Sequence, residues 1–175
     1  MQFKVKDIGA EGVDVDLPVT APWLSAQCPD VEASPGPGGL AFRGHLEQSG
    51  QDYLLRGQLA GSLTTVCSRC LEPADLPLDV PVSVVYVEKE REDSDDEEDQ
   101  LDAPDVLTFE DGVIDLAPEV RDEILLALPV SVLCRPECAG LCPVCGGNRN
   151  AKACDCVERE GAKVSKLAGL AKFKT

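Results

Sequence analysis

Stretches in which apolar and polar residues alternate follow one another through the first half of the chain. In residues 13–17, valine and leucine alternate with aspartate, which is the period-two pattern of a half-buried strand. A Pro/Gly-rich segment, residues 34–39, interrupts the pattern and is expected to be a loop. Further apolar runs occupy residues 40–46, 53–59 and 62–66. The connections between these runs are too short for crossover helices, so the pattern predicts antiparallel strands.

The strongest strand candidate is the run 76–87, in which every second residue from Val82 onward is apolar. Proline cannot donate a hydrogen bond to a neighbouring strand, so Pro77 and Pro81 indicate that this strand begins at a sheet edge or a bulge. Residues 106–116 predict a further pair of strands around a central Glu-Asp-Gly turn.

A helical spacing of three and four residues replaces the alternation between residues 116 and 128. Asp115 is placed to cap a helix that accepts Pro118 in its first turn, and Pro129 ends it. The residues that share its apolar face are Ala117, Val120, Ile124 and Leu128. We expect this helix to cover the apolar face of an antiparallel sheet, which predicts an α+β fold with a β-rich domain at 1–128.

The charge of the chain is unevenly distributed. Its net charge is −16, and residues 88–102 supply half of it, with ten acidic and two basic side chains. Such a run buries too little apolar surface to fold, so we expect an acidic loop at 88–105. Residues 149–175 hold seven basic and three acidic side chains, and 158–173 suit a basic tail helix. The net charge is therefore a poor guide to any local partner surface.

Nine cysteines need an explanation, and six of them lie between residues 134 and 156. The chain has no run of about 20 uncharged apolar residues and no secretory pattern at its start, so we expect a cytoplasmic protein without a membrane span. Thiols stay reduced in the cytoplasm, and the count of cysteines is odd, which favours metal over disulfides. We therefore predict a small cysteine-rich zinc module at 129–175, which also contains the basic tail.

The clearest metal-binding motif is Cys142-Pro-Val-Cys145-Gly. Two thiolates separated by two residues can reach one tetrahedral ion, and the glycine lets backbone N–H groups turn toward the sulfurs. The most local set of four ligands is Cys142, Cys145, Cys154 and Cys156, with Cys134 and Cys138 as alternates.

Cys67 and Cys70 form a second pair with the same spacing, at the end of a predicted strand. Three interpretations stay open: a redox pair, half of a metal site, or two semi-buried thiols. The strand-rich surroundings argue against a thioredoxin-like motif, which would begin a helix. Pairing with Cys134 and Cys138 would complete a second four-cysteine site.

Catalytic motifs are absent from the sequence. His45 is the only histidine, so no histidine cluster is available for a catalytic zinc. The sequence contains no Walker loop, no Gly-rich dinucleotide motif and no nucleophile elbow. We therefore expect a protein that is not an enzyme.

Three motifs together resemble a known family. They are Cys67-Ser-Arg-Cys70-Leu71, the run Val-Arg-Asp-Glu-Ile-Leu-Leu-Ala-Leu-Pro at 120–129, and the cysteine block 134–156. In these motifs the chain is similar to the YceD family, named for large-subunit ribosomal RNA accumulation. The resemblance covers roughly residues 40–175 and implies a role in accumulating or maturing that RNA, without implying a reaction.

The leading hypothesis is a non-catalytic ribosome-biogenesis factor that contacts ribosomal RNA or a large-subunit ribosomal protein. Basic side chains that could neutralise RNA phosphates are Arg69, Arg149, Lys163, Lys166, Lys172 and Lys174. Arg69 is expected to be an exposed charge between two cysteines. Two alternatives stay open: an adapter whose acidic surface binds a basic ribosomal protein, and a thiol redox enzyme that uses Cys67 and Cys70.

Overall fold

The computed structural model describes residues 1–89 and 105–156 of the 175-residue chain. Its strands are β1 (Gln2–Lys4), β2 (Val13–Pro18), β3 (Ala33–Ser49), β4 (Asp52–Val66), β5 (Pro73–Glu88), β6 (Asp105–Phe109) and β7 (Val113–Asp115). Its helices are α1 (Ala21–Gln27) and α2 (Ala117–Ala127), with a short 3-10 turn at Val5–Asp7. The predicted α+β class is confirmed.

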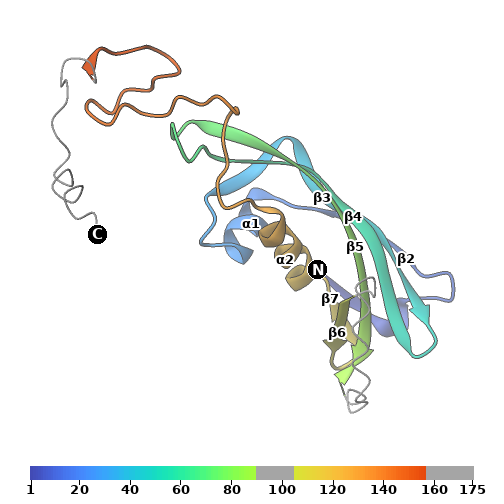
Figure 1. Ribbon diagram of the computed structural model, residues 1–175. Coiled ribbons are helices and arrows are strands. Elements are labelled where there is room, and N and C mark those ends of the chain that lie inside the picture. Colours follow the sequence, from blue (N-terminus) through green and yellow to red (C-terminus); the bar gives the residue numbers. More distant parts are fainter. Residues whose placement is uncertain (90–104, 157–175) are drawn as a thin grey trace, which may run out of the picture.

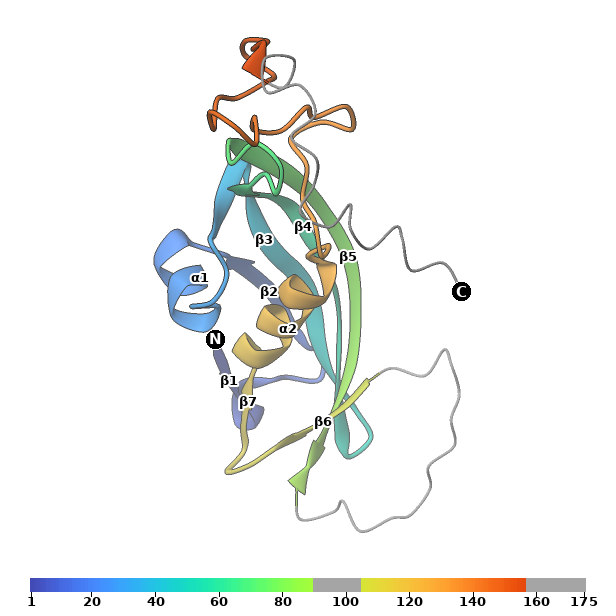
Figure 2. The ribbon, with the colours of Figure 1, turned by 60° about the vertical axis from the view of Figure 1, so that its left-hand side comes forward.

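A curved five-stranded sheet, in the order β2-β3-β4-β5-β6, forms the body of the fold. Its strands from β2 to β5 pair antiparallel, as predicted. Figures 1 and 2 show α1, α2 and the two-stranded β1–β7 sheet on the concave side. The core lies between these layers, where Leu55, Leu59 and Leu63 point from β4 and are fully buried. Spacings of four residues keep these leucines on one face of the strand.

The Pro/Gly-rich segment 34–39 is part of β3, so the predicted loop is wrong. The β3–β4 register runs from Pro35 opposite Leu63 to Leu40 opposite Gly61, so four residues of β3 bulge opposite one residue of β4. Gly61 has φ +140°, and a β-carbon there would lie 2.2 Å from a backbone oxygen of β3. A glycine at this close approach lets the strand continue past a sequence that resembles a break.

The prolines of β5 lie at a sheet edge, as predicted. The short strand β6 pairs only with Val84–Glu88, so among the described residues the first half of β5 is bonded on one side alone. Pro77 and Pro81 are four residues apart, so both lie on the same edge of the strand. Proline offers no N–H there, which protects the open edge from pairing with another chain.

The segment around the turn at Glu110 differs from the predicted strand pair. The turn is present, because the Val113 N–H donates a hydrogen bond to the Glu110 carbonyl at 3.0 Å. The two strands then diverge: β6 joins β5 in parallel and β7 joins β1. Phe109 is buried at the end of β6 against Tyr53, with ring centroids 5.6 Å apart. Turn residues fix the reversal, whereas packing selects the partner strands.

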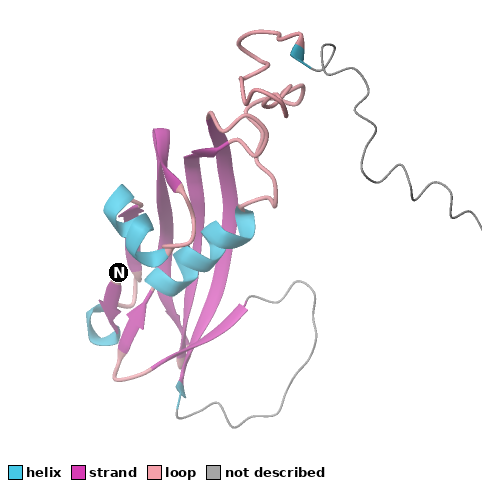
Figure 3. Ribbon diagram, turned by 90° about the vertical axis from the view of Figure 1, so that its left-hand side faces the viewer, coloured by secondary structure: helices cyan, strands magenta, loops and turns pink. Residues whose placement is uncertain are grey.

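Helix α2 forms where the sequence predicts it and is one residue shorter at each end than 116–128. The Asp115 carboxylate accepts a hydrogen bond from the Ala117 N–H at 2.9 Å, which satisfies a free donor at the first turn. Val120 and Ile124 are buried against the sheet, and Leu128 is partly buried. Figure 3 shows α2 lying across the strands as the predicted cover.

Helix α1 was missed by the sequence analysis. Thr20 caps it, because its hydroxyl accepts the Trp23 N–H at 3.4 Å, and Leu24 is fully buried. Its seven residues are too few to give a clear periodic pattern. Trp23 packs against the core and is partly buried.

Two predicted segments lie largely outside the described residues: the acidic loop 88–105 and the basic tail helix 158–173. Of the loop, Glu88 ends β5 and Asp105 begins β6, so both of its predicted ends are strand residues. Within the described ranges, no helix has the length and apolar composition needed to cross a bilayer.

Candidate metal centres

Eight of the nine cysteines gather into two groups of four at the end of the sheet. Within each group the four sulfurs lie within 4.8 Å of one another. The inner centre consists of Cys67, Cys70, Cys134 and Cys138, and the outer centre of Cys142, Cys145, Cys154 and Cys156. In Figure 1 the orange chain, which carries the six cysteines from Cys134 to Cys156, lies beyond the upper ends of β4 and β5, where the green turn between these strands holds Cys67 and Cys70.

The structure brings the cysteines that the sequence named as alternatives into two separate groups. The four cysteines proposed as the most local set come together in the outer centre. Cys134 and Cys138, named as alternates for that set, lie in the inner centre instead, with Cys67 and Cys70. Either group could hold a metal ion.

The sulfur separations fit tetrahedral metal coordination. They are 3.8 Å for Cys67–Cys138, 3.6 Å for Cys70–Cys134 and 3.9 Å for Cys145–Cys154. Four sulfurs bound tetrahedrally at about 2.3 Å from one zinc ion would be about 3.8 Å apart. A disulfide would require about 2.05 Å, and all nine cysteines are free.

The two C-x-x-C motifs form the same backbone turn. The Leu71 N–H donates to the Cys67 carbonyl at 3.0 Å, and the Gly146 N–H donates to the Cys142 carbonyl at 2.9 Å. The residue after each second cysteine is left-handed, with φ +62° at Leu71 and +70° at Gly146. One turn joins β4 to β5, and the other lies in the cysteine block, so each centre is built on an equivalent turn.

These turns direct backbone N–H groups at the first sulfur of each motif. The N–H groups of Cys145 and Val144 hydrogen-bond the Cys142 sulfur and lower its pKa to about 6. Burial raises the pKa of Cys67, but hydrogen bonds from backbone N–H groups, that of Arg69 first, outweigh it and lower the pKa to about 6. Both turns therefore favour the thiolate that a metal needs as ligand.

Other sulfurs in the same centres hold their protons strongly. Burial and neighbouring sulfurs raise the pKa of Cys134 to about 12. Hydrogen bonding with Cys145 and Cys154 raises the pKa of Cys156 to about 12. Like charges this close cannot all ionise unless a cation compensates them, and a divalent ion would release these protons. The donor sets thus fit a four-thiolate metal site.

The inner centre closes because the chain after α2 returns to the β4–β5 turn. The Ser68 N–H donates to the Val132 carbonyl at 2.8 Å, and the Leu141 N–H donates to the Arg69 carbonyl at 3.0 Å. The Arg69 guanidinium also donates to the Cys138 carbonyl at 3.2 Å. These hydrogen bonds therefore hold Cys134 and Cys138 beside Cys67 and Cys70.

Asn150, which lies in the loop between Cys145 and Cys154, contacts the inner centre and was missed by the sequence analysis. Its side-chain N–H donates to the Cys138 sulfur at 3.3 Å, and its side-chain oxygen accepts the Ala139 N–H at 2.8 Å. Nearby, the Asn148 amide donates to the Glu72 carboxylate at 3.3 Å. Asparagine is common in turns for local reasons, so its presence in a glycine-rich loop gave no sign of a role beside a metal ligand.

Of the residues predicted to contact RNA, the structure describes Arg69 and Arg149. Arg69 and Arg149 are both exposed, and the Arg149 backbone N–H donates to the Gly140 carbonyl at 2.9 Å. The lysines named with them lie outside the described residues: Lys163, Lys166, Lys172 and Lys174.

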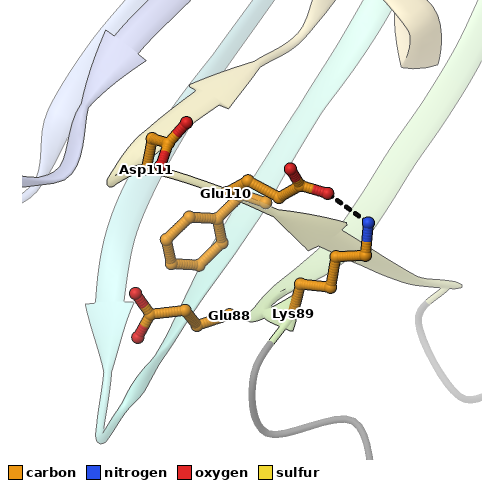
Figure 4. Close-up of a pocket in the computed structure, with 5 residues that line it drawn as sticks. Glu88, Lys89, Glu110 and Asp111 are labelled. Carbon is orange, nitrogen blue, oxygen red and sulfur yellow. Dashed lines mark hydrogen bonds and ion pairs between the residues drawn. The ribbon is translucent and has the colours of Figure 1, made fainter.

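A separate hollow of about 390 Å³ lies at the opposite end of the sheet, where β5 and β6 end (Figure 4). It is lined by Phe109 and by four charged residues, and Lys89 forms an ion pair with Glu110. Glu88 and Asp111 add further negative charge. This lining offers no nucleophile with an adjacent base, so the hollow does not resemble an active site.

A family model described as "Large ribosomal RNA subunit accumulation protein YceD" matches residues 55–174, which include both centres. The chain belongs to the YceD family. The match begins within β4 and covers both cysteine turns, so most of the β4–β5 hairpin, α2 and the candidate metal centres lie in the YceD part of the fold.

Relatives of this YceD protein occur in bacteria and plants. The "Large ribosomal RNA subunit accumulation protein YCED homolog 1, chloroplastic" of Zea mays is 32% identical over 142 residues, covering 67% of this chain and 48% of the maize protein. An uncharacterized protein of Mycobacterium tuberculosis is 33% identical over 102 residues, covering 58% and 47%. An uncharacterized protein of Bacillus subtilis is 29% identical over 79 residues, covering 45% and 42%. The chain spans about half the length of these relatives, and no solved structure gives a significant match.

Proposed function

We propose that this protein is a non-catalytic factor that supports the accumulation or maturation of large-subunit ribosomal RNA. Membership of the YceD family carries the proposal, because the family description names this process and the match spans residues 55–174. The maize relative bears the same description in its name. The factor would act by contact with ribosomal RNA or with a large-subunit ribosomal protein.

Each centre is proposed to hold one structural zinc ion. Four thiolates in a tetrahedral set close the coordination sphere and leave no position for a water or substrate, which is typical of structural zinc. The inner ion would join the chain after α2 to the β4–β5 turn, and the outer ion would hold the glycine-rich loop that follows. Zinc would thus stabilise the surface that contacts the partner.

The burial of the inner centre favours this role over redox catalysis by Cys67 and Cys70. Their exposed fractions are 0% and 3%, whereas a reactive thiolate must be reached by its substrate. Each also contacts a sulfur of the 134/138 pair. The sole histidine gives no support for an enzyme either, since Asp14 and the Glu11 carbonyl hydrogen-bond the two ring nitrogens of His45.

The charge of the described residues favours a protein partner as the second candidate mode of contact. Residues 1–89 and 105–156 hold 21 acidic and 10 basic side chains. Phosphates are repelled by such a surface, whereas lysine- and arginine-rich segments of ribosomal proteins are attracted to it. Direct RNA contact would instead depend on local positive charge at Arg149 and at the lysines after residue 156.

The test is removal of the gene followed by measurement of both ribosomal RNAs. We expect large-subunit ribosomal RNA to fall relative to small-subunit RNA, and the intact gene to restore it. Crosslinking in those cells then separates the modes: recovered RNA supports direct contact, and a recovered ribosomal protein without RNA supports the adapter. An unchanged ratio of the two RNAs would contradict the proposed process.

A further inference from the structure

Leu71 occupies a backbone conformation that disfavours its side chain. Its φ of +62° lies in the left-handed region, where the β-carbon of an L-residue approaches the backbone carbonyl too closely. In the equivalent turn of the outer centre the same position is Gly146, with φ +70°. Glycine is the residue that adopts this conformation without steric cost. The turn itself therefore does not require a leucine.

Packing within the chain does not explain the leucine either. Its side chain is 64% exposed, and it does not belong to the buried cluster formed around Cys67 and Cys70. A large apolar side chain that is both strained and exposed stabilises neither the turn nor the core. An outlier of this kind is a reason to consider a function for the side chain.

A hollow of about 340 Å³ lies directly beside Leu71, against the paired ends of β3 and β4. Val66, Pro73 and Thr64 also line it, and Val66 is 38% exposed. Leu71 and Val66 thus present two aliphatic side chains to one open groove, which we call the Leu71 groove. Its size suits a single apolar side chain with part of its backbone.

The charges around the Leu71 groove are acidic. Glu32 lines it, and Glu72 directly follows Leu71 in the chain. Asp75 lies on β5 opposite Thr64, and its carboxylate accepts a hydrogen bond from the Thr64 hydroxyl. All three carboxylates are on exposed residues. The groove therefore combines an aliphatic wall with a negative rim, to which Glu32 contributes from the lining and Glu72 and Asp75 from neighbouring positions.

We propose that the Leu71 groove binds a lysine- and arginine-rich segment of a partner protein, which inserts an apolar side chain between Leu71 and Val66. The apolar contact would supply affinity, and the carboxylates would steer basic side chains to the rim. RNA is the less suitable occupant, because its phosphates would meet Glu32, Glu72 and Asp75. The inference rests on the proposed function, of which it specifies the protein-contact branch.

The variant that tests it is Leu71→Gly. Glycine relieves the left-handed strain and copies the outer turn, so the melting temperature of the full chain is expected to stay or rise. The matched control is Val106→Gly, because Val106 is also 64% exposed and lies on β6, away from the groove. Both variants remove one exposed aliphatic side chain.

The binding assay uses tiled synthetic peptides that cover the large-subunit ribosomal proteins of the same organism. We expect the intact protein to select peptides that combine several basic residues with an apolar one, with affinity that falls as salt rises. Leu71→Gly should weaken the best peptide about tenfold or more, and Val106→Gly should leave it unchanged. Single-stranded RNA oligonucleotides are tested as a second probe. The proposal would be overturned if Leu71→Gly bound the best peptide as tightly as the intact protein does, or if the intact protein selected no peptide. It would also be overturned if Leu71→Gly weakened binding to the RNA oligonucleotides alone.

Complementation in cells separates this inference from the proposed function. If removal of the gene lowers large-subunit ribosomal RNA and Leu71→Gly fails to restore it, the proposed function and the proposed role of the Leu71 groove are both supported. If Leu71→Gly restores the RNA fully, the groove is not the working surface, although the function stands. If removal of the gene changes nothing, the proposed function fails, and the peptide assay still decides the groove.

Discussion

The Arg69 guanidinium donates a hydrogen bond to the backbone carbonyl of Cys138 at 3.2 Å. The two residues are 69 positions apart in the chain, and this bond joins the β4–β5 turn to the segment that supplies the other half of the inner centre. Arg69 is exposed, as the sequence predicts, but its side chain also has a structural partner.

Arg69→Glu is therefore expected to destabilise the inner centre. The substitution removes the donor to the Cys138 carbonyl and places a carboxylate beside thiolates, at a cost of about 1–3 kcal/mol. Thermal unfolding and the rate of zinc transfer to a chelator would measure the effect. Arg149→Glu is the control, and its melting temperature should stay unchanged. Should Arg69→Glu be as stable as Arg149→Glu, the hydrogen bond contributes nothing, and any loss of function by Arg69→Glu would reflect a partner contact.

The metal content of the purified protein should be about two zinc ions per chain. Cys138→Ser and Cys145→Ser should each reduce it to about one. Their effects on folding should differ, because the inner centre is buried against the β4–β5 turn and Cys145 is exposed. Elemental analysis with thermal unfolding would show a large drop in melting temperature for Cys138→Ser and a small one for Cys145→Ser. A metal-free protein with unchanged stability would contradict both centres.

Gly57→Ala should destabilise the sheet by about 1–3 kcal/mol, because a close approach must be relieved. A β-carbon at Gly57 would lie 2.6 Å from Cζ of Phe42 and 2.5 Å from the Arg43 carbonyl oxygen. Phe42 is fully buried, so its ring cannot move into solvent. Denaturant unfolding measures the difference, and Gly9→Ala is the control, since beyond its own chain neighbours no atom would lie within 4 Å of its β-carbon. Equal stability of the two variants would show that the core adapts around Phe42.

Stability should fall as the pH rises toward neutrality because of Glu119. Its side chain on α2 is buried, and burial, followed by the charge of Glu123, raises its pKa to about 7 from 4.5. Between about pH 4.5 and pH 7 the Glu119 carboxyl therefore keeps its proton in the folded state and loses it in the unfolded chain. The stabilisation is full below about pH 4.5 and is lost as the pH rises to about 7, by as much as about 3 kcal/mol.

Glu119→Gln tests this, because an amide cannot ionise. Denaturant unfolding between about pH 5 and 8 should show a flatter profile for the variant and a greater stability than the parent at the upper end. Asp30→Asn, which changes an exposed carboxylate that is not among the charges raising the pKa of Glu119, should keep the parent profile. Parallel profiles for the parent and Glu119→Gln would mean that Glu119 ionises normally in the folded state.

Several parts of the fold follow from the sequence because they depend on neighbouring residues. The alternation in 13–17 places Val15 inward on β2, and the spacing after Asp115 gives the capped helix α2. Pro77 and Pro81 indicate a sheet edge, because a residue without an N–H cannot serve a strand on that side. The spacing of Cys142 and Cys145 gives a turn whose sulfurs could hold a metal ion, for a similar local reason.

Tertiary structure decides what lies far apart in the chain. Sulfurs 71 and 64 positions apart meet in the inner centre, and β6 pairs with β5 rather than with β7. Each such contact forms only when helices and strands pack, and several pairings satisfy the local pattern equally well. The sequence by itself thus determined most strands of the main sheet, the covering helix α2 and the cysteines able to bind metal. Packing alone decided which cysteines share a centre and placed Leu71 beside an acidic groove, because long-range contacts are selected by the burial of the whole core rather than by the residues next to them.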